Sequence, residues 1–208
     1  MMGKIRSERP SRLARALLAD IEGLAAIEMA LILPIALMLM RLIVYGGQLY
    51  TVQRKVTLGA TTVANLMAQG NNNGSATITA AELNQILAYP GLILYPYDGS
   101  GVQVVASQLL VTVNANGTAT GTVEACPTGS ATPCSWANAN GTPHPIGWQL
   151  SVDPSIASAF SGSGNNYVIL GEVQYPFQPT GIYFAVGPII LNDSIMMIPR
   201  TAAQITVQ

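Results

Sequence analysis

One carboxylate interrupts an apolar stretch near the start of the sequence. Residues 24–40 are LAAIEMALILPIALMLM, and Glu28 is the only charged residue among them. A charged side chain near the centre of a membrane helix costs about 2.5–3.5 kcal/mol on insertion scales, so a carboxylate here requires a function. If the chain were cut after Gly23, Leu24 would carry a new α-amino group about one helical turn from Glu28. Glu28 would then be the fifth residue of the mature protein.

The segment GLAAIEMALILP, which begins at Gly23, resembles the amino-terminal signature of type IV pilins and pseudopilins. It is most similar to the TadE/TadG-like branch of the tight-adherence (Tad) pilus system, which has G-x-x-x-x-E followed by an aromatic residue and A-L-x-L-P. Met29 stands where that branch usually has Phe or Tyr, and Glu22 precedes Gly23 where a basic residue is commoner. The resemblance implies that a prepilin peptidase cleaves between Gly23 and Leu24 and that Glu28 directs assembly.

The same resemblance implies a structural role and a set of partners. These are other pilin or pseudopilin subunits, the prepilin peptidase, the Tad secretion and assembly machinery and the lipid bilayer, with no cofactor. The expected function is that of a minor pilin or pseudopilin in the assembly of a Tad-type (type IVb, Flp) pilus and in surface adhesion. The alternative is an uncleaved single-pass membrane protein whose outer domain binds a surface or cell-envelope partner.

Charges are few and unevenly placed. Only 9% of the 208 residues are charged, against about 25% in an average globular protein. Residues 1–23 contain five basic and three acidic side chains, a net charge of +2, and the remainder has four basic and seven acidic side chains, a net charge of −3. A basic flank predicts that the amino terminus stays in the cytoplasm, with one pass through the inner membrane and a periplasmic or extracellular carboxyl-terminal part. The lack of a basic patch beyond residue 23 argues against nucleic acid as a partner.

The apolar stretch is just long enough to cross a bilayer. Its 17 residues give about 26 Å of helix, at the lower limit for a membrane span. Pro34 has no backbone N–H to donate, so a kink is expected there. A cleavable secretory signal is an alternative, but its apolar core would be only about 7–15 residues long and would end at a small-x-small site, which this stretch lacks.

A helical pattern continues beyond the apolar stretch. Apolar or small residues recur at steps of three and four, at Leu49, Val52, Val56, Gly59, Val63 and Leu66. This spacing predicts a helix packed along one face, and the sequence after residue 69 is rich in Gly and Asn, which predicts its end. Three regions follow: a basic cytoplasmic leader (1–23), a transmembrane and continuing amphipathic helix (24–69) and an extracytoplasmic head (70–208).

The head is expected to contain one short helix and an antiparallel sheet, so the predicted fold class is α+β with a long, pilin-like amino-terminal helix. Thr79 and Glu82 have the spacing of a capping box for a helix that closes at Pro90. Alternating apolar residues predict strands at 102–113, 118–124, 146–152, 167–177 and 189–199. Between the first two, Asn116-Gly117 favours a tight type I′ turn. In the strand 167–177 the alternation changes phase near Gly171, which predicts a β-bulge.

Cys126 and Cys134 both lie on the side of the membrane that the charge pattern places outside. In an oxidising compartment they could form a disulfide across the Pro- and Gly-rich loop 126–145, and two free thiols are the alternative. The remaining features do not predict an enzyme. The single histidine, His144, lies between two prolines and is expected to be an exposed loop residue, and no metal site is predicted from a lone histidine.

Overall fold

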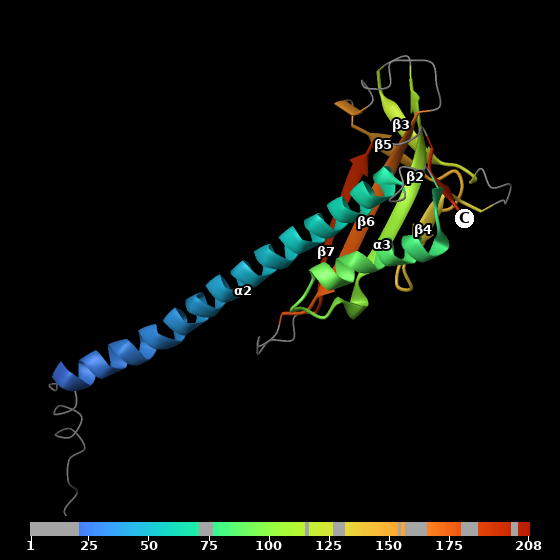
Figure 1. Ribbon diagram of the computed structural model, residues 1–208. Helices are drawn as coiled ribbons and strands as arrows, with labels where there is room; N and C mark the ends of the chain where they lie inside the picture. The colour runs from blue at the N-terminus through green and yellow to red at the C-terminus, as the bar shows by residue number, and fades with distance from the viewer. Residues whose placement is uncertain are drawn as a thin grey trace, which may run out of the picture. The chain divides into compact units, whose positions relative to one another are not determined.

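The computed structural model describes residues 21–70, 77–114, 117–126, 132–153, 155–156, 166–179, 187–200 and 204–208, with side chains from residue 26 onward. The chain divides into two compact units, Met1–Gln48 and Leu49–Gln208. The first unit contributes the amino-terminal part of a long helix, and the second contains a sheet and its covering helices (Figure 1).

Helix α2 spans Ile21–Gln69 and belongs to both units. It continues through Pro34 without interruption. From residue 27 to residue 44 its large apolar side chains are each at least half exposed. Among the described residues, this is the helix that is long and apolar enough to cross a membrane, by length and composition. The predicted helix over residues 24–69 is therefore confirmed as secondary structure.

The second unit is built on an antiparallel sheet with strand order β5-β3-β2-β6-β7, in which the short strand β4 also pairs with β2. A separate two-stranded parallel sheet joins β1 to β8. The long amino-terminal helix and this antiparallel sheet agree with the predicted α+β class. The remaining elements are β1 (Thr77–Ile78), α3 (Ala80–Ile93), η1 (Gly99–Gly101), β2 (Gln103–Val113), β3 (Ala119–Val123), β4 (Ser135–Ala137), β5 (Gln149–Val152), β6 (Tyr167–Phe177), β7 (Ile189–Met197) and β8 (Thr206–Val207).

The carboxyl-terminal part of α2 packs its apolar face into the main core of the second unit. Val52, Val56 and Val63 are at most 1% exposed, as their spacing predicted. The buried face is wider than the predicted seam, because Met67 and three small side chains beside the seam are also buried. The small side chains are Ala60, Ala64 and Ala68. Alanine on this face lets the helix axis approach the sheet closely.

Helix and sheet approach each other closely at Gly171 in β6. A Cβ atom added there would lie 2.8 Å from the Ala60 carbonyl oxygen and 2.9 Å from the Ala64 nitrogen. The predicted bulge is wrong, because β6 pairs without a break through Gly171 with both β2 and β7. The glycine is required by the helix that crosses it and not by an irregularity in the strand.

The change of phase in β6 arises from two different cores on the two faces of the sheet. Ile169 and Val173 belong to the core under α2, whereas Val168 and Leu170 belong to a second core on the opposite face. Both faces are therefore apolar in the first half of the strand. In the second half, the face opposite α2 carries Glu172 and Gln174, and the strand alternates normally.

The helix α3 begins as predicted and ends later than predicted. Thr79 and Glu82 form the complete capping box, in which the Thr79 N–H donates to the Glu82 carboxylate at 2.9 Å. Pro90 lies inside the helix instead of ending it, and the Leu94 N–H donates to the Pro90 carbonyl. Leu94 is fully buried, so tertiary packing holds this last turn in place.

The hairpin between β2 and β3 differs from its predicted turn by one residue. The Asn114 N–H donates to the Thr118 carbonyl at 2.8 Å, so the described ends of the hairpin pair with three residues between them instead of two, and Gly117 has φ +79°. A two-residue turn at Asn116-Gly117 is therefore wrong, and Asn116 itself lies outside the described residues. A shift of one residue would exchange the two faces of β3, so burial of its alternate side chains in the second core determines the register.

Other strands are shorter than predicted or were not predicted at all. Strand β5 begins at Gln149, three residues later than expected, and β4 lies within the region 126–145 that was predicted to be loop. The short strands β1 and β8 had no recognisable alternation. The sequence also indicates a helical turn at 153–160 and a turn at 161–166, and most of these residues lie outside the described ranges.

Substitution of Gly171 tests the close approach of α2 to the sheet. We expect Gly171→Ala to lower the free energy of unfolding by about 1–3 kcal/mol, because the new methyl group would overlap the backbone of α2. Gly187→Ala is the matched control, since a Cβ there meets nothing within 4 Å, and should change stability by less than about 0.5 kcal/mol. Chemical denaturation of the two variants measures the difference, and equal stabilities would contradict the packing.

The capping box predicts a specific dependence on pH. Hydrogen bonds from the Thr79 backbone N–H and then from its hydroxyl lower the pKa of Glu82 below its usual value. Because the pKa is lower in the folded state, ionised Glu82 stabilises the protein above its unfolded-state pKa, and this contribution is lost as pH falls through the folded-state pKa. The stability difference between the wild type and Glu82→Gln should therefore shrink on acidification, as denaturation at neutral and acidic pH would measure. A stability difference that is constant with pH would contradict a stabilising role for ionised Glu82.

Candidate functional site

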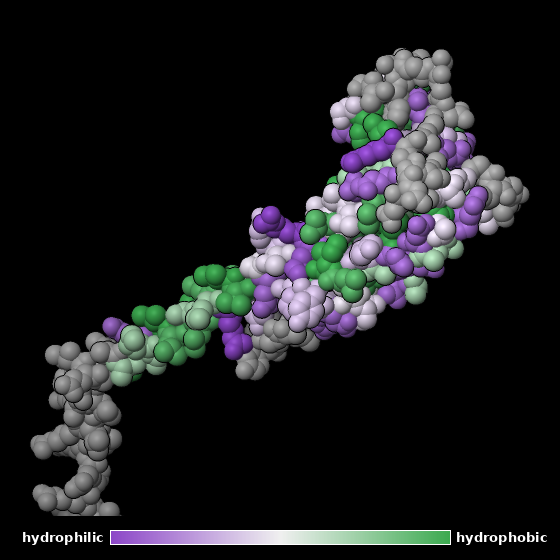
Figure 2. Space-filling model, viewed as in Figure 1, coloured by the Kyte–Doolittle hydropathy of each residue, from purple (hydrophilic) through white to green (hydrophobic). Residues whose placement is uncertain are grey.

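The first candidate site is the apolar part of α2 that contains Glu28. Glu28 is exposed, and so are its apolar neighbours, with Ile27 at 68% and Leu31 at 71%. Figure 2 shows apolar residues gathered along this part of the helix. Glu28 makes no ion pair within the described part of the chain. Burial of this surface must therefore come from lipid or from another molecule.

The two residues of the predicted cleavage junction lie in the first turn of α2. The helix begins at Ile21, so the backbone at Gly23 and Leu24 is helical. A peptidase that binds an extended substrate would have to unwind this turn. Glycine is a weak helix former, which lowers the cost of unwinding at Gly23 by about 1 kcal/mol relative to alanine.

A disulfide joins Cys126 to Cys134, with Cα atoms 4.9 Å apart. It closes the loop through which the chain leaves β3 and returns as β4 to the same edge of β2. The Cys134 N–H donates to the Glu124 carbonyl at 2.9 Å, and the Cys134 carbonyl accepts from the Gln108 N–H of β2 at 2.8 Å. The disulfide therefore stabilises the point at which β4 replaces β3 beside β2.

The environment of His144 differs from the one that the sequence predicted. Its Nε2 atom lies 2.6 Å from a carboxylate oxygen of Glu172 in β6, and its side chain is only 21% exposed. Its ring also stacks on Trp148, with centroids 3.7 Å apart and planes inclined by 12°. The prediction of an exposed loop histidine is wrong, because residues that are distant in sequence surround it.

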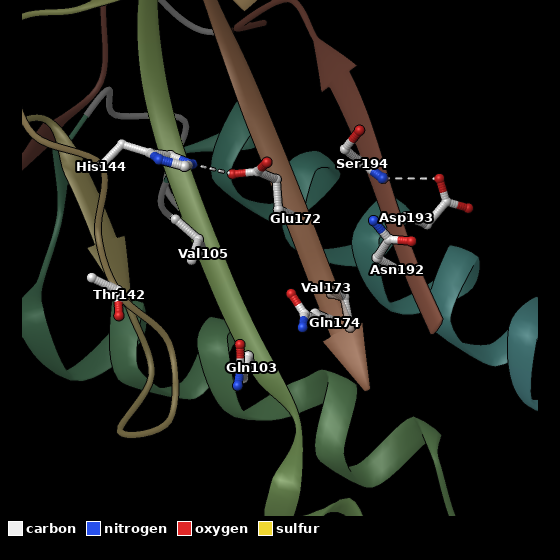
Figure 3. Close-up of a pocket in the computed structure, with 10 residues that line it drawn as sticks. All are labelled: Gln103, Val105, Thr142, His144, Glu172, Val173, Gln174, Asn192, Asp193 and Ser194. Carbon is white, nitrogen blue, oxygen red and sulfur yellow. Dashed lines mark hydrogen bonds and ion pairs between the residues drawn. The ribbon is translucent and has the colours of Figure 1, made fainter. Parts of the chain in front are cut away.

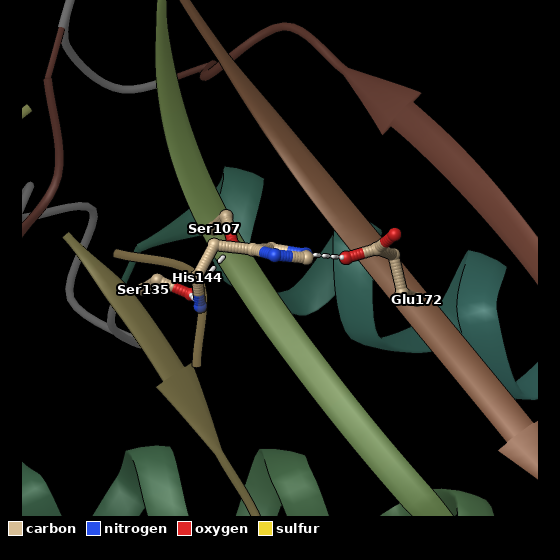
Figure 4. A network of polar contacts seen from close by, with 4 residues as sticks. All are labelled: Ser107, Ser135, His144 and Glu172. Carbon is tan, nitrogen blue, oxygen red and sulfur yellow. Dashed lines mark hydrogen bonds and ion pairs between the residues drawn. The ribbon is translucent and has the colours of Figure 1, made fainter. Parts of the chain in front are cut away.

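Two serines extend this contact into a network without forming a catalytic triad (Figure 4). The Ser135 hydroxyl accepts from the backbone N–H of His144 at 2.8 Å and lies 2.7 Å from the Ser107 hydroxyl. A serine nucleophile would have to hydrogen-bond to the imidazole ring, whereas Ser135 contacts the main chain. Both serines are buried, so the network acts to hold the loop against β2.

Beside this network is a hollow of about 410 Å³ on the sheet face opposite α2 (Figure 3). Its floor comes from β2, β6 and β7, and Thr142 and His144 form a wall. The lining residues are mainly polar and uncharged: Gln103, Val105, Thr142, His144, Glu172, Val173, Gln174, Asn192, Asp193 and Ser194. No group of three or more metal-ligating side chains occurs in the described ranges.

Comparison of the chain with protein-family models, with curated proteins and with solved structures finds no significant match. The resemblance of the amino-terminal segment to TadE/TadG-like proteins therefore stays a prediction. Sequence reasoning did not find the hollow, because its polar residues come from three strands that are separated in sequence. The one available signal was polar residues alternating along the second half of the strand that became β6.

Substitutions of His144 separate the stacking contact from the ion pair. His144→Phe keeps a ring against Trp148 but loses the contact with Glu172, whereas His144→Ala loses both. Aromatic pairs contribute about 0.5–1.5 kcal/mol beyond their buried area, and a partly exposed ion pair contributes about 0–1 kcal/mol. We therefore expect His144→Phe to retain more than half of the stability that His144→Ala loses, as measured by chemical denaturation. Equal losses would show that the contact with Glu172 dominates.

Proposed function

We propose that this chain is a structural membrane protein, a minor pilin- or pseudopilin-like subunit that takes part in assembly of a Tad-type (type IVb, Flp) pilus. The observation that carries the proposal is Glu28, a carboxylate five residues after Gly23 on a helix whose apolar side chains are exposed. An isolated helix in lipid would bear the cost of that charge with no gain. A subunit that assembles with others is stabilised when the Glu28 carboxylate pairs with a positive charge on a neighbour.

The physical basis of assembly is pairing of Glu28 with the α-amino group of a neighbouring subunit. Cleavage after Gly23 would create that amino group at Leu24. Inside a bundle of apolar helices the effective dielectric constant is low, so the attraction between the two charges offsets much of their desolvation. Neighbouring helices would also cover the exposed apolar side chains and the backbone carbonyl that Pro34 leaves without a donor.

The proposed location is the inner membrane, with the amino terminus in the cytoplasm, a single pass and the second unit outside. The disulfide supports this orientation, because disulfides persist in oxidising compartments. The partners are other subunits, the prepilin peptidase and the assembly machinery. The second unit carries few charges, which suits it to contact with other surfaces and supports a role in adhesion.

A second candidate function is that of an uncleaved single-pass protein whose outer unit binds a surface or cell-envelope partner. The continuous helical backbone from Ile21 through Leu24 favours it, because that helix must unwind before cleavage. Intact mass of the protein extracted from membranes separates the two candidates. A chain that begins at Leu24 supports the first, and a chain that retains its leader supports the second.

The assembly role of Glu28 predicts that cross-linking between subunits requires a negative charge at this position of the helix. Glu28→Ala and Glu28→Gln should insert into the membrane normally but reduce cross-linking to neighbouring subunits at least tenfold. Gly23→Ala should accumulate as the unprocessed precursor. The matched control combines Glu28→Ala with Ile27→Glu, which restores a carboxylate about 100° away around the helix and should not restore cross-linking. Wild-type levels of cross-linking in Glu28→Ala would overturn the proposal.

A further inference from the structure

The polar hollow contains a row of three carboxamides on adjacent strands. Gln103 of β2 lies opposite Gln174 of β6, and Gln174 lies opposite Asn192 of β7. Neighbouring strands are about 4.8 Å apart, so the row crosses about 10 Å of the sheet face. Within the described part of the chain, these three carboxamides make no side-chain hydrogen bond, and Figure 3 shows all three beside the hollow.

The wall of the hollow is held in place before any ligand arrives. The Asn138 carboxamide accepts from the Val104 N–H at 3.1 Å and donates to the Val102 carbonyl at 2.8 Å. Asn140 donates to the same carbonyl at 3.1 Å. These contacts bind the loop to β2, and the stacking of His144 on Trp148 fixes its far end. A preformed wall reduces the ordering cost of binding.

The charges around the hollow disfavour an ionic ligand. Glu172 is paired with His144, and Asp193 is engaged by the Thr57 hydroxyl and the Ser194 N–H. No lysine or arginine is among the described residues that line it, so an anion would meet carboxylates without a compensating cation. The free groups are amides, each with one acceptor and two donors.

We propose that this hollow binds an uncharged saccharide. A sugar hydroxyl is both a donor and an acceptor, so neighbouring hydroxyls match a row of amides that offer both functions. The volume falls within the range of about 300–1,000 Å³ that small-ligand sites occupy. A peptide fits less well, because extended peptides bind by pairing with a free strand edge, and the hollow lies on the sheet face, where β2 and β6 are paired on both sides.

This inference goes beyond the assembly role of α2, because binding can be measured on the unassembled subunit. The full-length protein is purified in a detergent whose headgroup is not a sugar, such as lauryldimethylamine oxide, and titrated calorimetrically with cellotetraose and with chitotetraose. Saturable binding of either oligosaccharide is expected. The two probes distinguish a plain hexose polymer from an N-acetylated envelope glycan as the source of the sugar.

Two variants and a matched control locate the site. Gln174→Ala and Asn192→Ala should each raise the dissociation constant at least tenfold. The control, Gln85→Ala, removes an exposed carboxamide from α3 and should leave the dissociation constant unchanged. Asn192 is exposed, so its replacement is not expected to disturb folding. The inference is overturned if neither sugar binds, if both variants bind like the wild type, or if tetragalacturonate or tetraalanine binds in preference to the neutral sugars.

Discussion

The close contact between α2 and β6 is the constraint on which the second unit depends. Ala60 and Ala64 bring the helix backbone to the sheet at a strand position without a side chain, Gly171. Because the helix approaches so closely, the valines on either side of the contact reach the main core and are almost completely buried. The same approach places the Thr57 hydroxyl against Asp193 of β7, so a polar contact also links the helix to an outer strand of the sheet.

With one face of the sheet covered by α2 and α3, the opposite face determines what the unit can bind. Half of that face is a second core closed by Trp148 and Ile156. The other half carries polar side chains in rows, and no apolar cluster of the described residues covers it. The boundary is set by the loop that follows β4, which Asn138 attaches to β2 and which brings His144 to Glu172. One loop thus completes the second core and forms the wall of the hollow.

Helix α2 has two different environments along its length. Beyond residue 48 its burial is supplied by the protein's own sheet. Before residue 45, protein atoms of the described chain cover little of its apolar surface, and the proposed function assigns that cover to lipid and to neighbouring helices. Glu28 lies in the second environment. A carboxylate at such a position is unfavourable for a helix alone in lipid and favourable where a partner supplies a positive charge, and this contrast supports the proposed role in assembly.

The amino-acid sequence by itself determined the features that depend on neighbours along the chain. The apolar stretch and the helical spacing to residue 69 predicted α2, the Thr79 and Glu82 pair predicted the start of α3, and alternation predicted the major strands. These patterns report which side of an element is buried, because burial repeats with the period of the element. They do not report what covers that side.

Tertiary structure alone decided the features that depend on that covering. The phase change in β6 predicted a bulge, but the strand has no bulge. Two cores on opposite faces of the sheet produce the phase change. Gly171 is required by a helix more than a hundred residues earlier in the chain, and Pro90 remains helical because Leu94 is buried. The row Gln103, Gln174 and Asn192 exists only because three separate strands pair in one register. Pairing between distant segments leaves no periodic signal in either segment, so only the folded chain contains the hollow.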